Sequence, residues 1–163
     1  MSAKKRRQQI PSHPLRGHHT RLVTLLEGLV AEAKKDDRSK LRPMWATFES
    51  ALLAHINAEE AELLPPYRRG HPVEAQAIEE DHRFFRKTLV EFGVDLDLHL
   101  MKASAVETFG RRLRAHAASE DRELYPWAKR ALPPEVLARF RRIAEGEPAP
   151  AQPSDAALEV GMP

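Results

Sequence analysis

Residues 52–65, LLAHINAEEAELLP, decide the fold of this chain, because a looser copy of them returns 61 residues further on. Seven positions recur in type and spacing: His55, Glu59, Glu60, Glu62, Leu63, Leu64 and Pro65 return as His116, Glu120, Asp121, Glu123, Leu124, Tyr125 and Pro126. In a helix, residues four apart share a face, so each His-x3-Glu sets an imidazole beside a carboxylate. The chain therefore carries two matched polar pairs.

Apolar residues at steps of three and four lead up to each pair and place it on the inward face of its helix. The two series are Leu41, Trp45, Phe48 and Leu52, and Val106, Phe109 and Leu113. An unpaired buried carboxylate is strongly destabilising unless it takes up a proton, so a polar pair in a core needs a compensating partner. Imidazoles and carboxylates together predict that this partner is a metal ion.

Composition limits the classes of protein that the chain can belong to. Its 163 residues, 42% of them apolar, suffice for one domain with a core. No apolar run approaches the ~20 residues that cross a bilayer, and the N-terminus lacks the apolar stretch of a secretory signal. We therefore expect a soluble, cytoplasmic protein with no membrane partner. The absence of cysteine excludes disulfides, thiolate metal sites and iron–sulfur clusters.

The charge pattern argues against nucleic acid as a partner. The net charge is only +2, and the basic residues Lys4 to Arg7 form a short tail with no groove-reading motif behind it. We expect a solvated, flexible tail there.

The periodic segments predict an all-α fold, an up-down-up-down antiparallel four-helix bundle. Its helices are expected at about 14–35, 40–64, 72–101 and 104–129. Pro65-Pro66 should stop the second helix, and Ser104 with Glu107 three residues on predicts a capping box for the fourth. Along the chain we expect the basic tail at 1–12, the bundle at 13–130, a short C-terminal helix at 131–145 and a disordered Pro- and Ala-rich tail at 146–163.

Four histidines should meet at one level of this bundle. His19 and His82 lie on inward faces, and their neighbours match at a constant offset of 63, which favours His19 over His18. The midpoints between successive polar positions fall at about residues 38, 69 and 100, inside or at the predicted turns. A short turn folds positions equidistant from it side by side, so these residues should form one site. His99 is also on the inward face but lies about 25 Å from His82 along the helix, too far to be a ligand.

Other residues near this level have less specific expected roles. The remaining acidic residues of the two repeats should face solvent or lie behind the ligands: Glu60, Glu62, Asp121 and Glu123. Tyr67 and Tyr125 lie near the same end of the bundle and could line the site, although we favour a packing role for both.

The motifs LRGHHTRL, His-x3-Glu-Glu, Asp-His-Arg and His-x3-Glu followed by LYP, in that order, resemble the hemerythrin-like, or HHE cation-binding, domain over residues 10–130. The resemblance implies a non-haem di-iron centre, its two iron ions bridged by carboxylates and an oxo or hydroxo group. It implies a small ligand of the kind of oxygen, peroxide or nitric oxide. By this resemblance the terminal ligands are His19, His55, His82 and His116, and the bridging ligands are Glu59 and Glu120.

The third helix departs from the oxygen-carrying members of that family. Those proteins have two histidines four residues apart there, whereas Ile78 and Arg86 lie four residues either side of His82. Glu79 could supply the missing ligand in the Glu-x2-His spacing of carboxylate-rich di-iron bundles. Such an oxygen-rich donor set favours ferric iron over reversible oxygen carriage. Asp121 is the alternative to Glu120, because oxygen carriers place an aspartate five residues after the last histidine; the repeat favours Glu120.

Three functions share this fold and donor set. We expect first a di-iron protein that reacts with or senses a small oxidant, and a sensor of this kind needs a separate protein as its output partner. The alternatives are a di-iron enzyme of the peroxidase or catalase type, and a protein that stores iron or holds metal for structure.

Overall fold

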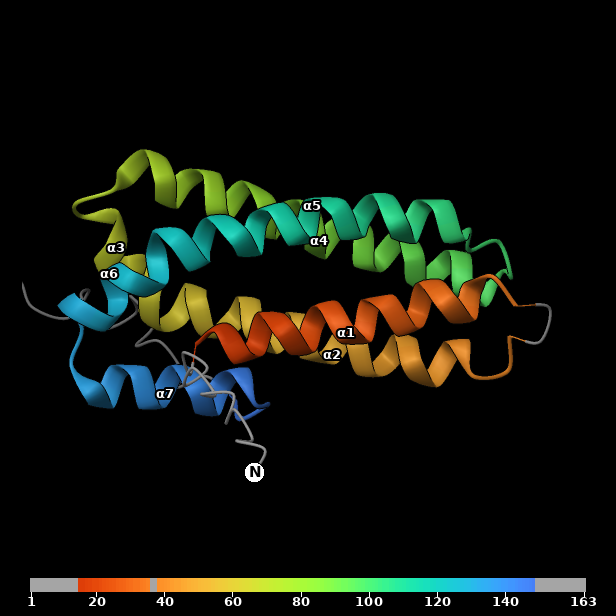
Figure 1. Cartoon of the computed structure of the whole chain (residues 1–163), viewed down its shortest axis with the longest axis horizontal. Helices are drawn as coiled ribbons and strands as arrows, with labels where there is room; N and C mark the ends of the chain where they lie inside the picture. The colour runs from red at the N-terminus through yellow and green to blue at the C-terminus, as the bar shows by residue number, and fades with distance from the viewer. Residues whose placement is uncertain (1–14, 36–37, 149–163) are drawn as a thin grey trace, which may run out of the picture.

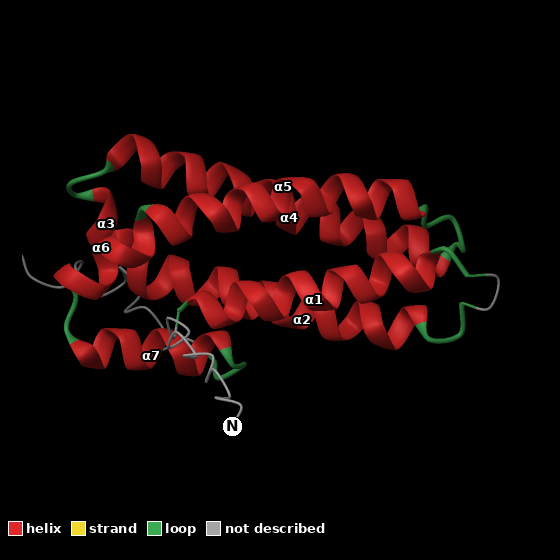
Figure 2. Cartoon of the chain, viewed as in Figure 1, coloured by secondary structure: helices red, strands yellow, loops and turns green. Residues whose placement is uncertain are grey.

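The structure of the chain, a computed structural model, describes residues 15–35 and 38–148. Within these residues every regular element is a helix and there is no β-strand. Four long helices run antiparallel with turns at alternate ends (Figures 1 and 2): α1 (Arg16–Ala33), α2 (Leu41–Ala58), α4 (Pro72–Asp97) and α5 (Ala103–Arg122). This confirms the predicted up-down-up-down bundle. The predicted tails lie outside the described residues, apart from residues 146–148.

None of the helices in the described part of the chain is long and apolar enough to span a membrane.

The sequence predicted that the second bundle helix stops at Pro65-Pro66. In the structure the helical chain continues past both prolines. At Glu59 it passes into a π-helical turn, η1 (Glu59–Leu63), and continues as the short helix α3 (Leu64–Arg68). Proline has no N–H, and its ring clashes with the carbonyl four residues back, so α-helical bonding cannot pass through both prolines unchanged. The N–H of Leu64 instead donates to the carbonyl of Glu59, five residues back. This wider turn lies at a predicted ligand, where π-turns are frequent.

The fourth bundle helix is also interrupted. α5 ends at Arg122, and after Glu123 the chain resumes as α6 (Leu124–Ala131). The expected single helix to about residue 129 is therefore wrong in this detail. Pro126 explains the break, because it can neither donate to the carbonyl of Arg122 nor fit its ring against that carbonyl in a regular helix.

The turn between α4 and α5 also differs from the prediction. α4 ends at Asp97, not near residue 101, and His99 takes a positive φ of 59° that turns the chain. α5 is preceded by Lys102 as its N-cap and has no side-chain cap, so the predicted capping box of Ser104 and Glu107 is wrong. Glu107 instead forms an ion pair of 2.6 Å with Lys34.

Two apolar cores fill the bundle and leave a polar layer between them. One core surrounds the interlocking rings of Phe48, Phe85 and Phe109, whose centroids lie 5.4 to 6.1 Å apart in the two closest pairs. The other lies toward α3 and α6, around Leu63 and Leu124. On all four long helices, the residues between these cores are the predicted ligands. The packing therefore isolates one polar level inside an apolar bundle.

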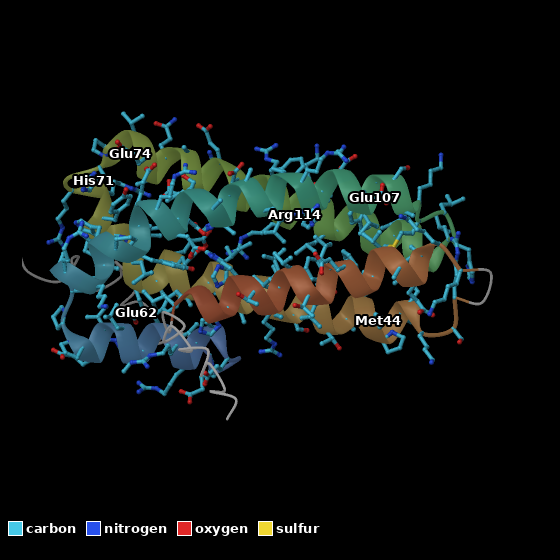
Figure 3. The ribbon with its side chains drawn as sticks, viewed as in Figure 1. Met44, Glu62, His71, Glu74, Glu107 and Arg114 are labelled. Atoms are coloured by element: carbon cyan, nitrogen blue, oxygen red, sulfur yellow. The ribbon has the colours of Figure 1, made fainter. Side chains whose placement is uncertain are left out.

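A further helix, α7 (Pro134–Ala144), packs along α2 and η1 outside the four-helix bundle (Figure 1). Its Phe140 is fully buried. Arg139 holds it in place by donating from Nε to both carboxylate oxygens of Glu62, at 3.0 and 3.1 Å. Glu62 is buried and lies between the bundle and α7 (Figure 3). The helix therefore closes the side of the bundle next to the polar layer.

Candidate metal centre

The polar layer is built from one histidine of each long helix and two glutamates, and all six side chains are buried: His19, His55, His82, His116, Glu59 and Glu120. Their nitrogen and oxygen atoms form two groups of four, and within each group the atoms lie within 4.8 Å of one another. One group joins His19 and His55 to the two glutamates, and the other joins His82 and His116 to the same glutamates. Glu59 and Glu120 thus belong to both groups.

The separations between these atoms suit donors arranged around a cation. Nε2 of His19 lies 3.1 Å from Nε2 of His55 and 3.1 Å from Oε2 of Glu120. Nε2 of His116 lies 3.1 Å from Oε1 of Glu120. Neighbouring ligands that are each about 2.1 Å from a metal ion, at right angles to one another, lie about 3 Å apart. The cluster therefore has the spacing of a coordination shell.

Polar atoms of this cluster are buried without hydrogen bonds to the described residues: His55 Nδ1, Glu59 Oε2, His82 Nε2 and both carboxylate oxygens of Glu120. His82 Nε2 and Glu59 Oε2 lie only 3.2 Å apart, yet they are not aligned as donor and acceptor. Buried polar atoms are almost always satisfied, since leaving one unpaired costs about 1 to 3 kcal/mol. Glu120 Oε2 lies 3.1 Å from His19 of the first group, and Glu120 Oε1 lies 3.1 Å from His116 of the second, so a cation in each group would satisfy both oxygens. The cation of the second group would also satisfy His82 Nε2. The donor set fits a metal ion.

Three of the imidazoles are held from behind by a carboxylate. Nδ1 of His19 lies 3.2 Å from Asp121, and Nδ1 of His82 lies 3.1 Å from Glu60. Nδ1 of His116 lies 3.1 Å from Asp81. A proton kept on Nδ1 by a carboxylate leaves the lone pair of Nε2 free to bind a metal ion, which is the usual arrangement behind metal-binding histidines.

The same carboxylates change the protonation of these histidines in the metal-free protein. Burial by itself lowers the pKa of each, but for His19 the contacts with Asp121 and Glu120 outweigh it and raise the pKa to about 9. Burial also lowers the pKa of His82, but its contacts with Glu59 and Glu60 outweigh burial and raise the pKa to about 9. At His116 the attraction of Glu120 and the hydrogen bond to Asp81 raise the pKa to about 10.

His55 is the exception among the four histidines. Burial lowers its pKa to about 3, because the attraction of Glu59 is weaker than the cost of desolvation. Both shared glutamates stay ionised: burial raises their pKa values, but the neighbouring imidazoles outweigh burial and lower them. Protons thus balance the carboxylates in the metal-free cluster. A metal ion must displace those protons in order to bind.

The structure brings together six of the seven predicted ligands. It places His19 in the cluster and leaves His18 half-buried against Phe140, with ring centroids 5.7 Å apart. It places Glu120 in both groups, whereas Asp121 contacts the far side of His19.

Glu79 is the predicted ligand that lies outside the cluster. Its carboxylate forms an ion pair with Arg68 of α3. Three residues along a helix leave it about 60° around the axis from His82, on the flank of α4 that faces α3. Since α3 was not expected, neither was this partner.

Two functional contacts escaped the sequence patterns. Asp81 reaches across from α4 to His116, and no single-helix periodicity shows such a contact. The hydroxyl group of Tyr125 donates to Oε1 of Glu59 at 2.7 Å, inside the cluster, so this residue lines the site, which was the less favoured of its two expected roles. The sequence repeat did indicate the other two carboxylates that hold histidines from behind. Glu60 and Asp121 are equivalent positions of the repeat, and each contacts a histidine of a neighbouring helix.

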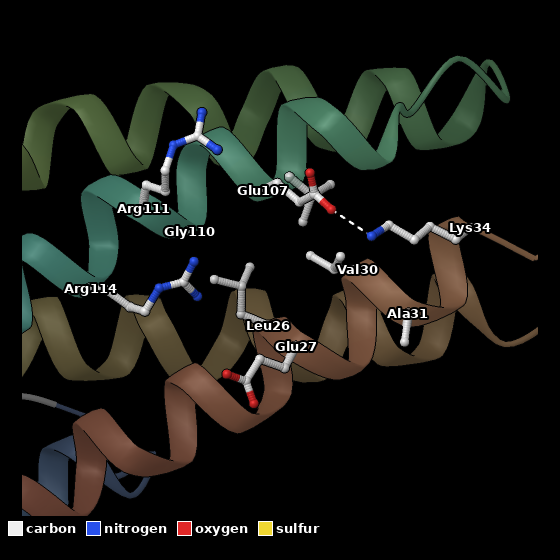
Figure 4. A pocket seen from close by; sticks show the side chains of 10 residues that line it. Leu26, Glu27, Val30, Ala31, Lys34, Glu107, Gly110, Arg111 and Arg114 are labelled. Carbon is white, nitrogen blue, oxygen red and sulfur yellow. Dashed lines mark ion pairs between the residues drawn. The ribbon is translucent and has the colours of Figure 1, made fainter.

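Several hollows open on the surface of the described residues, among them two that lie against α5. One, of about 230 Å³, lies between α4 and α5 and is lined by His116 and Glu120 of the cluster among other residues. A larger one, of about 560 Å³, lies between α1 and α5, bordered by Lys34, Glu107 and Arg114 (Figure 4). It contains none of the donors. The smaller hollow is therefore the one that bears on the site.

Comparison with known proteins agrees with this geometry. The family model described as the hemerythrin HHE cation binding domain matches residues 11–128. The match includes all six donors of the cluster and ends before α7. Searches of the curated proteins and of the solved structures gave no match.

Proposed function

Because the chain belongs to the hemerythrin HHE cation-binding family, we propose that its buried cluster binds two iron ions as a non-haem di-iron centre. The observation that carries this proposal is the pair of four-donor groups that share Glu59 and Glu120. A carboxylate has two oxygens and can bridge two cations, so two shared glutamates suit two like-charged ions held close together. Imidazole and carboxylate are donors that suit iron, and the chain has no thiolate to select a softer metal.

We propose further that the centre meets a small oxidant: oxygen, peroxide or nitric oxide. When bound, the iron pair supplies electron-transfer chemistry that the side chains lack. The chain itself excludes large substrates, because apolar cores enclose the cluster on both sides. The hollow beside His116 and Glu120, about 230 Å³ in volume, has room for a molecule of this size.

The packing of α7 favours a sensor over a carrier. The ring of Phe140 lies 6.2 Å from that of His55 and 6.2 Å from that of Tyr125, centroid to centroid. A change in the position of either ring must shift Phe140, because close-packed interiors do not deform continuously. α7 would then report the state of the cluster to a separate output protein.

Peroxide titration of the iron-loaded, reduced protein tests this proposal. A sensor consumes peroxide only until its iron is oxidised, and the fluorescence of Trp127, in α6 before α7, changes at the same point. An enzyme of the catalase or peroxidase type keeps consuming peroxide in proportion to time. The control is His116→Ala, which should bind less iron and give neither response. Steady turnover of peroxide would show that the protein is an enzyme and not a sensor. Uptake of far more than two iron ions per chain would show that it stores iron.

A further inference from the structure

The two sequence repeats carry different side chains at one pair of equivalent positions. Residue 64 is a leucine and residue 125 is a tyrosine, and both are fully buried. The side chain of Leu64 belongs to the apolar core around α3 and α6. The hydroxyl group of Tyr125 instead lies among the donors, 2.7 Å from Glu59 Oε1, 3.0 Å from His19 Nε2 and 3.5 Å from His55 Nε2.

Tyr125 faces the cluster because of the break between α5 and α6. In an uninterrupted helix, a residue five positions after Glu120 would lie about 140° around the axis from it. The break at Glu123 turns the chain so that Tyr125 points inward. Its ring is then fixed by stacking on that of His19, with centroids 5.0 Å apart and an interplanar angle of 17°. The hydroxyl group is therefore placed by the fold and not by a mobile side chain.

Of the three residues around this hydroxyl group, His19 and His55 belong to the first donor group alone, and Glu59 belongs to both groups. The distances from the hydroxyl oxygen to the two histidine nitrogens, 3.0 and 3.5 Å, are close to the 3.1 Å that separates those nitrogens from each other, and its 2.7 Å distance to Glu59 is that of a hydrogen bond. We propose that the phenol oxygen of Tyr125 is a fifth donor to the cation held by the first donor group. The equivalent residue of the first repeat is Leu64, whose apolar side chain cannot be a ligand, so the repeat supplies no matching donor and the two iron ions would be unequal. This inference rests on the proposed di-iron function.

The chemistry of a phenol supports this assignment. The hydroxyl group of Tyr125 donates a hydrogen bond to Oε1 of Glu59. Phenolate is a hard oxygen donor, and tyrosine serves as an iron ligand in haem proteins. A bound ferric ion reverses the local electrostatics, because its charge outweighs that of the neighbouring carboxylates. If the Tyr125 oxygen held the ion as a phenolate, its proton would pass to solvent, as happens when a protonated ligand takes up a metal ion. Oε1 of Glu59 would then lose its hydrogen bond from Tyr125 and would be free to hold the ion as well.

The colour of the ferric protein tests the inference without any activity assay. Phenolate bound to ferric iron gives a charge-transfer band in visible light, and excitation in that band enhances phenolate vibrations in the Raman spectrum. The chain has two tyrosines. Tyr67 is the matched control, because it is buried but stacks on His71 and meets Trp127 edge-on, outside the two donor groups. In Tyr67→Phe, any phenolate signal can come only from Tyr125.

We expect Tyr67→Phe, loaded with ferric iron, to show the visible band and the phenolate vibrations, and Tyr125→Phe to lose both while it keeps its iron. If Tyr125→Phe fails to fold, the Tyr67→Phe spectrum still decides. Two ferric ions per chain in Tyr67→Phe without phenolate vibrations would overturn the inference and leave the proposed function standing. Failure of every variant and of the wild type to bind iron in elemental analysis would overturn both.

Discussion

Glu120→Gln removes one negative charge from the centre of the cluster while keeping the shape of the side chain. The Glu120 carboxylate lies 3.1 Å from both His19 and His116 and 3.9 Å from His82. It belongs to both donor groups. In the metal-free protein the substitution leaves protonated imidazoles without their shared anion. In the iron-loaded protein it takes a bridging ligand from both positions.

The size of the effect follows from the protonation of His116. Its pKa of about 10 means that at pH 7 the protonated form of His116 is favoured over the neutral form by about 4 kcal/mol, the net result of burial and of its carboxylate neighbours. Asp81 remains beside His116 in the variant and keeps part of this interaction. We therefore expect the metal-free variant to lose about 2 to 4 kcal/mol of unfolding free energy, comparable with the loss on breaking other buried ion pairs. For a domain of this size the melting temperature should fall by on the order of 10 °C.

Urea denaturation of the metal-free protein at pH 7 measures the loss of unfolding free energy. Elemental analysis after iron loading measures the iron content, which should fall below two ions per chain. The control is Glu123→Gln. That carboxylate is exposed and lies 3.9 Å from Arg122, so its loss should change stability by less than about 0.5 kcal/mol and leave the iron in place. A Glu120→Gln protein as stable as the wild type, with its full complement of iron, would refute the reasoning.

Three further outcomes are expected. The metal-free protein should lose stability as the pH rises from about 6.5 to between 9 and 10. The pKa values of His19, His82 and His116 are higher in the folded protein than in the unfolded chain, and their ion pairs are lost when they lose their protons. Urea midpoints that do not fall across this pH range would contradict this expectation. Phe140→Ala should cost about 3 to 5 kcal/mol in the same assay, since it empties a fully buried site between α7 and the cluster; a loss below about 1 kcal/mol would mean that α7 does not depend on this contact. Glu79→Ala should keep its iron, whereas His116→Ala should lose it, because Glu79 pairs with an arginine of α3 outside the cluster. Loss of iron from the Glu79 variant in elemental analysis would show that Glu79 is a ligand after all.

The helices and the level of the site could be predicted because both depend on spacing along the chain. Apolar steps of three and four show the inward face of each helix, and His55 with Glu59 marks where that face turns polar. Short turns then bring the polar positions together, since an antiparallel bundle pairs residues equidistant from a turn. The helices and the level of the site can therefore be predicted without knowing which side chains meet between helices.

The contacts that the sequence did not reveal all depend on breaks in the helices or on contacts between helices. The proline-induced π-turn creates α3, whose Arg68 pairs with Glu79 on the flank of α4. The break at Glu123 turns Tyr125 toward the cluster. Asp81 lies on the outer flank of α4 and acquires its role only because α5 brings His116 beside it. Periodicity describes a regular helix, and these residues matter where the helices are irregular or meet.

The central claim is that the cluster holds two iron ions, each by two histidines of its own and the two glutamates that both share. The most direct test is the metal content of protein purified after expression in iron-supplemented medium, measured by elemental analysis against protein concentration from amino-acid analysis. The account predicts about two iron ions per chain, in agreement with the two donor groups. One zinc ion per chain, or no metal of any kind, would contradict it.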